Sequence, residues 1–97
     1  MSDRVALATW QQALNLVSAK GIPHENRAGI EMLIYETERL TIAYTPAKDE
    51  RPNGLDIWRH GDADRKVLDV IWTDGTMPII VTYWGGAWEH LLKQARV

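Results

Sequence analysis

Residues 66–83 read KVLDVIWTDGTMPIIVTY, and they contain the strongest fold signal of the chain. Asp74-Gly75 separates two apolar runs. Asp-Gly is a frequent hairpin turn, because the favoured two-residue turn needs positive φ at both central positions. The stretch therefore predicts a β-hairpin with one apolar face, made of the pairs Trp72–Met77, Val70–Ile79 and Leu68–Val81.

Pro78 adds a constraint to this hairpin, because proline has no N–H to donate to a neighbouring strand. In a strict two-residue turn, Pro78 would take a hydrogen-bonded position opposite Ile71. A four-residue loop over Thr73–Thr76 keeps the same facing pairs and turns the missing N–H away. An edge position of the strand has the same effect, with Pro78 as a guard against uncontrolled pairing. The sequence leaves both solutions open.

The second face of the hairpin is mixed in character. It sets Asp69 opposite Ile80 and Val67 opposite Thr82, so it is neither polar enough for full solvation nor apolar enough for a deep core. A face of this kind predicts an interaction surface, covered by a helix or by a second subunit. The candidate interaction residues are Val67, Asp69, Ile71 and Ile80.

The rest of the chain divides into one clear helix and several shorter segments. Apolar residues recur at helical spacing from residue 2 to residue 20, Ser2 can cap the start, and Gly21 and Pro23 end the helix. Ile30–Tyr44 predicts a hairpin turning at Thr37-Glu38, although a helix followed by a strand also fits. Strands are expected at 55–59, 66–73 and 77–83, loops at 24–29, 45–54 and 60–64, and a last helix at 87–94.

This order predicts a single α+β domain over residues 1–97. Its antiparallel sheet of four to five strands in hairpins would be flanked by an N-terminal and a C-terminal helix packed on one face. The expected core consists of Leu7, Trp10, Leu14, Val17, Leu68, Val70, Trp72, Ile79, Val81, Trp88 and Leu91.

Composition excludes some classes of function. A net charge of −2 gives no electrostatic basis for binding nucleic acid or an anionic membrane. The chain has no cysteine, so disulfides and thiolate metal sites are impossible. Neither a signal peptide nor an apolar run of about 20 residues is visible, and a cytoplasmic location is expected.

Few residues suggest chemistry. His60, Asp62 and Asp64 lie within five residues, but the ligand pattern of a calcium or zinc site is incomplete, and an ordinary polar turn is expected. Asp56 and Asp69 lie on predicted strands and would suit acid–base work only if they faced each other in a cleft. No catalytic residue, cofactor or metal ligand is therefore predicted.

The favoured interpretation is a small non-enzymatic binding module that contacts another protein or a second copy of itself through the second sheet face. A weaker hypothesis is an inhibitor-type partner of another protein. The alternative from a different class is a small-ligand or enzymatic domain with an aromatic-lined pocket, whose candidate residues are Tyr44, Trp58, Tyr83 and Trp84.

Overall fold

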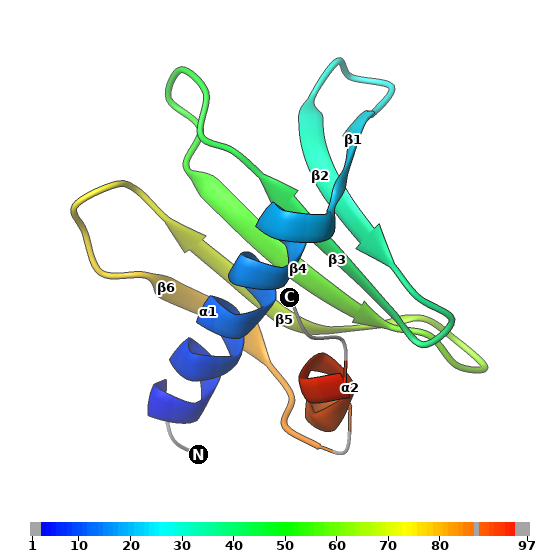
Figure 1. Cartoon of the computed structure of the whole chain (residues 1–97). Helices are drawn as coiled ribbons and strands as arrows, with labels where there is room; N and C mark the ends of the chain where they lie inside the picture. The colour runs from blue at the N-terminus through cyan, green and yellow to red at the C-terminus, as the bar shows by residue number, and fades with distance from the viewer. Residues whose placement is uncertain (1–2, 87, 95–97) are drawn as a thin grey trace.

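The computed structural model describes residues 3–86 and 88–94, and Figure 1 shows its arrangement. A long helix comes first, six strands follow, and a six-residue helix comes last. The elements are α1 (Asp3–Lys20), β1 (Ile22–Glu25), β2 (Glu31–Glu36), β3 (Leu40–Thr45), β4 (Asn53–Arg59), β5 (Arg65–Trp72), β6 (Ile79–Tyr83) and α2 (Glu89–Gln94).

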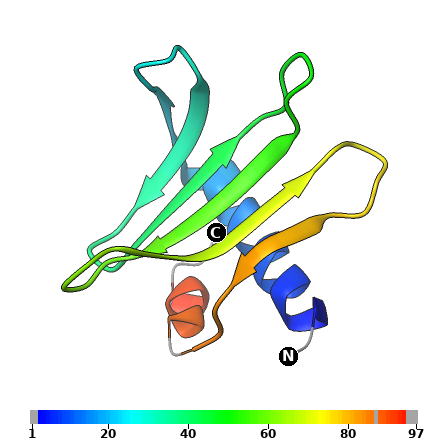
Figure 2. The same ribbon diagram turned by 180° about the vertical axis from the view of Figure 1, so that it is seen from behind.

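The six strands form one antiparallel meander in which every strand pairs with its sequence neighbours. β1 and β6 are therefore the two edges. Helix α1 crosses one face of the sheet, and α2 lies near one end of it (Figure 1). Seen from behind, the other face is crossed by neither of the two described helices (Figure 2). We call this second face the open face.

The core lies between α1 and the sheet. Ala13, Leu16 and Val17 of α1 pack on the central strands, and Trp88 and Leu92 near the C-terminal end complete the cluster. Apolar residues at alternating positions of β3 and β4 face the helix, because successive side chains of a strand point to opposite faces. The sheet residues of this core are Leu40, Ile42, Leu55, Ile57, Val67, Leu68 and Val70.

The expected architecture is wrong in two respects. The sheet has six strands rather than four to five, and the helical layer consists mainly of α1, because the C-terminal helix is only six residues long. The missed strand is β1. Its residues Pro23, His24 and Glu25 look like a loop, but an edge strand tolerates proline, since its outer N–H groups have no neighbour.

The N-terminal helix and the first expected hairpin are confirmed. α1 ends at Lys20, and a Cβ on Gly21 would lie 2.4 Å from the Val17 carbonyl oxygen, so the helix can pass closely into β1 only at glycine. β2 and β3 form the hairpin expected within Ile30–Tyr44, but its register differs by two residues. A turn at Thr37-Glu38 would set Tyr35 opposite Leu40, whereas Tyr35 lies opposite Ile42. The expected cap, Ser2, lies outside the described residues.

The register predicted around Asp74-Gly75 is also wrong. The Asp74-Gly75 turn is closed by a 3.1 Å hydrogen bond from the Thr76 N–H to the Thr73 carbonyl. Neither the two-residue nor the four-residue solution holds, because both would keep Trp72 opposite Met77, and these two residues do not pair. Only Gly75 has a positive φ there, at 83°. β5 and β6 begin to pair further from the turn, with Ile71 opposite Ile79. The register then shifts by one residue between Val70 and Asp69. The edge position considered for the Pro78 strand is correct.

This register explains the errors in the predicted core. Ile79 and Val81 are exposed, whereas Val17, Leu68, Val70 and Trp88 are buried as expected. Trp10, Leu14 and Trp72 pack at the margin of the core, and Leu7 is half-buried. The side chain of Leu91 lies outside the described residues.

Truncating a core isoleucine should cost far more stability than truncating an edge isoleucine. Ile57→Ala removes a fully buried side chain and leaves a cavity, so we expect a loss of about 3 kcal/mol in the free energy of unfolding. Ile79→Ala, at a side chain 59% exposed, should cost less than about 1 kcal/mol. Urea unfolding measures both, and equal losses would contradict the described core.

Candidate functional site

The open face carries two facing carboxylates at the centre of the sheet. Asp56 of β4 lies directly opposite Asp69 of β5, and the same cross-strand row continues to Ala43 on β3 and Thr82 on β6. The neighbouring row, with Leu55 opposite Val70, belongs to the core. The strand alternation thus places two facing carboxylates on the side away from α1.

Lys66 joins this acid pair. Its Nζ lies 3.7 Å from Asp56 Oδ1 and 3.7 Å from Asp69 Oδ2. Lys66 and Asp69 are three residues apart, a spacing that puts side chains on opposite faces of a regular strand. Here the register between β4 and β5 shifts after Ile57, which leaves Val67 as an extra residue. This β-bulge brings the ammonium to the carboxylates.

Trp58 borders the cluster on the same face. It lies opposite Lys66 in the register, and the Lys66 Nζ lies 4.9 Å from the centre of its ring. This is a cation–π distance, so Lys66 is held by two carboxylates and one aromatic ring. We call Asp56, Trp58, Lys66 and Asp69 the central cluster.

The central cluster shifts the protonation of one of its acids. Burial, reinforced by the contact with Asp69 and by its negative charge, raises the pKa of Asp56 to about 7. Lys66 acts in the opposite direction but does not cancel the shift. Asp56 therefore exchanges its proton close to neutral pH, and the charge of the open face changes in that range.

A second polar network begins beside the central cluster. Thr41 Oγ1 donates to Glu36 Oε2 over 3.0 Å and lies 2.7 Å from His60 Nε2. His60 Nδ1 lies 3.2 Å from Asp64 Oδ1. His60 is thus fixed between Thr41 and Asp64, as in the polar turn that the sequence indicates. In residues 3–86 and 88–94, no three His, Asp or Glu side chains gather as a metal site would require.

The structure separates the predicted interaction residues. Asp69 and Ile71 lie on the open face, but Val67 is buried in the core and Ile80 packs against the core. The assumption that all four residues share one face is therefore wrong. Its physical cause is the irregular register on both sides of β5, which a regular alternation does not anticipate.

The four aromatic residues predicted to line a pocket do not lie together either. Tyr44 stacks on Trp72 at 5.9 Å on the helix side, whereas Trp58 lies on the open face. Tyr83 donates to Glu89, and burial together with this contact raises the pKa of Tyr83 to about 12. Trp84 is exposed, with the Arg65 guanidinium 5.8 Å from its ring centre.

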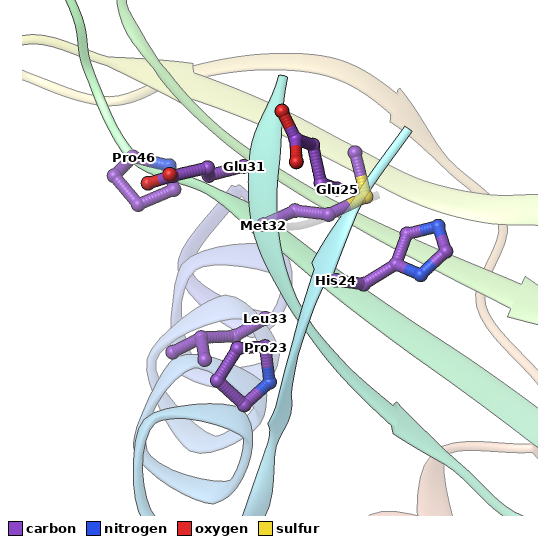
Figure 3. A pocket seen from close by; sticks show the side chains of 7 residues that line it. All are labelled: Pro23, His24, Glu25, Glu31, Met32, Leu33 and Pro46. Carbon is purple, nitrogen blue, oxygen red and sulfur yellow. The ribbon is translucent and has the colours of Figure 1, made fainter. Parts of the chain in front are cut away.

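A surface pocket of about 440 Å³ lies instead at the β1–β2 hairpin. Figure 3 shows Pro23 and Leu33 on the side of α1, and His24 and Met32 on the other side of the hairpin. Glu25 and Glu31 face each other across the strands, so their like charges oppose each other. The side chains that line this pocket diverge rather than converge, and none of them is a tryptophan, tyrosine or phenylalanine.

Comparison with known proteins gives no relative: no family model, no curated protein and no solved structure matches this chain. Within the described part of the chain, neither helix has the length and apolar composition needed to span a membrane.

Sequence reasoning identified Asp56 and Asp69 as strand carboxylates that might face each other, and the register brings them together. It missed Lys66, which looks like one of several scattered basic residues. Lys66 lies two residues before the buried Leu68, but this spacing alone does not reveal the bulge that turns Lys66 to the open face.

The stability of the protein should depend on pH through Asp56. Because its folded pKa is raised from 3.8 to about 7, the folded state binds the proton more tightly than the unfolded state. This contribution to stability is full below about pH 4 and is lost as pH rises through 7. Relative to Asp56→Asn, the wild type should lose about 2–3 kcal/mol between pH 5 and pH 8.

Urea unfolding of both proteins at several pH values measures this difference. Asp62→Asn, at an exposed carboxylate of the β4–β5 turn, is the matched control for the loss of one charge. A difference between the wild type and Asp56→Asn that does not change with pH would contradict the raised pKa.

Proposed function

We propose that this protein is a non-enzymatic binding module whose open face takes a segment of a partner protein. That segment would carry apolar side chains around one lysine or arginine. The observation that carries the proposal is a charged cluster at the centre of a sheet face that no described helix covers. Because the charged cluster lies on this face and not in the core, a partner protein can contact it.

Apolar side chains around the central cluster supply contact area. Trp58 is 37% exposed, and Ile71 and Ile79 face each other at the β6 side of the same face. An exposed tryptophan is a frequent anchor of protein interfaces, because it buries much area at a small cost in conformational entropy. These residues would surround the partner's cation and exclude water from it.

The charges favour a basic partner over a second copy on this face. Above pH 7 the central cluster holds two carboxylates and one ammonium, which is a net charge of −1. Two open faces packed on each other would bring two such clusters together. A lysine or arginine of another protein instead complements the net negative charge of the acid pair.

The alternative of an aromatic-lined ligand pocket has less support. Tyr44 and Tyr83 pack on the core, Trp58 lies on the opposite face, and Trp84 is near Arg65. A site made by all four side chains would need a different sheet register. We therefore retain the binding module as the proposed function.

Selection from a random peptide library, displayed at pH 8, tests this proposal. The enriched peptides should carry a lysine or arginine flanked by apolar residues. Their affinity should fall about tenfold or more for Asp69→Asn and for Trp58→Ala, because these changes remove one charge and the aromatic anchor. Binding should also weaken as pH falls below 7, where Asp56 takes up its proton.

Glu50→Gln is the matched control, since Glu50 is an exposed carboxylate in the β3–β4 connection. It should leave the affinity of the selected peptides unchanged. Peptides without a common cation, or peptides that bind Asp69→Asn as tightly as the wild type, would contradict the proposed site.

A further inference from the structure

The β6 edge of the sheet has an unusual composition. Residues 77–84 read MPIIVTYW and contain no charged side chain. Four exposed large apolar residues lie in this stretch: Met77 at 75%, Ile79 at 59%, Val81 at 55% and Trp84 at 59%. Elsewhere in the described residues only Val5, Ile22 and Trp58 are comparable. The exposed apolar surface is thus concentrated along one strand and its flanks.

This strand also has a free backbone edge. Within the described residues β6 pairs only with β5, so the N–H and C=O groups on its outer side have no strand neighbour. Such an edge can template pairing with another strand, and proteins usually protect it with charged side chains. β6 has none, although Pro78 and the irregularity near Val81 limit the segment that can pair.

The opposite edge of the sheet is better protected. β1 is only four residues long, and it contains Pro23, His24 and Glu25. Proline removes one donor and the glutamate adds a charge, which are two common ways of preventing edge pairing. The contrast between the two edges indicates that β6, rather than β1, is adapted to receive another strand.

We propose that β6 pairs antiparallel with β6 of a second copy of this chain, which joins two six-stranded sheets into one. A two-fold axis sets the same strand against itself, so any charge on that strand would lie near its own copy. β6 has no charged side chain, so this repulsion does not arise there. Two copies paired through β1 would bring Glu25 near its own copy, and two packed open faces would bring the acid pairs together. The charges therefore favour self-association at this edge.

Side chains on both sides of the edge add to the interface. A pair of five-residue strands alone falls short of the roughly 1,000 Å² that a stable interface buries. Met77, Val81 and Trp84 supply further apolar surface on the same strand and its flanks. This pairing leaves the central cluster uncovered, so the proposed partner and the second copy can bind together, with Ile79 at the border of the two surfaces.

Sedimentation equilibrium tests the proposal with the full chain. The wild type should be a dimer at ~200 µM, well above the micromolar dissociation constants of weak complexes. Val81→Lys places a charge in the middle of the edge and should weaken dimerisation at least about 100-fold. Ile22→Lys, at a comparably exposed residue on β1, is the matched control and should remain dimeric.

Trp58→Lys separates this inference from the proposed function. It alters the open face and not the edge, so the variant should stay dimeric even though peptide binding is lost. A monomeric wild type, a Val81→Lys dimer as stable as the wild type, or a Trp58→Lys monomer would overturn the proposal. Circular dichroism confirms that each variant is folded.

Cysteine cross-linking gives a second readout that does not depend on a disruptive change. The chain has no cysteine, so single substitutions at positions 79–83 report only on the new thiols. A two-fold axis through an antiparallel pair brings one strand residue opposite its own copy, at a Cα separation that a disulfide can bridge. At least one of these variants should form a covalent dimer, whereas Ile22→Cys should not. Absence of cross-linking at all five positions would overturn the proposal.

Discussion

The structure depends on the packing of one amphipathic helix against one face of a six-stranded sheet. Ala13, Leu16 and Val17 of α1 lie against the central strands, and the alternation of strand side chains divides every strand between the core and the open face. Leu55 and Val70 face the helix, so their neighbours Asp56 and Asp69 must face away from it. The position of the acid pair is therefore a direct consequence of how the core is covered.

The β-bulge in β5 also determines which side chains lie on the open face. The bulge at Val67 buries two successive apolar residues and brings Lys66 to the side of Asp69. In a strand of regular alternation, Lys66 would lie on the helix side of the sheet, because it is three residues from Asp69, and the acid pair would lose this counter-ion. The bulge thus stabilises a charge arrangement that repulsion between two facing carboxylates would otherwise oppose.

The sequence predicts the elements better than it predicts their registration. Helical spacing identifies α1, and Asp74-Gly75 marks the β5–β6 hairpin, because both signals are local. The β1 strand escapes prediction since an edge strand needs neither apolar alternation nor every N–H group, and Pro23 therefore looks like a loop residue. Bulges have no comparable local signature, so sequence reasoning placed Val67 beside Asp69 and Val81 in the core.

Two surfaces follow from the same architecture, and their charges distinguish them. The open face combines Trp58 with a cluster whose net charge changes near neutral pH, as burial and Asp69 raise the pKa of Asp56 to about 7. The β6 edge is uncharged and apolar. A basic partner suits the first surface and a second copy suits the other, so both could be occupied together.

The described residues, 3–86 and 88–94, leave the open face of the sheet uncovered. Hydroxyl-radical footprinting with mass spectrometry tests it directly, because Trp58 and Trp88 have the same side-chain chemistry and differ in exposure, at 37% and 4%. The account predicts that Trp58 is oxidised several times faster than Trp88 in the free protein. Equal protection of the two tryptophans would show that this face is covered and would contradict the account.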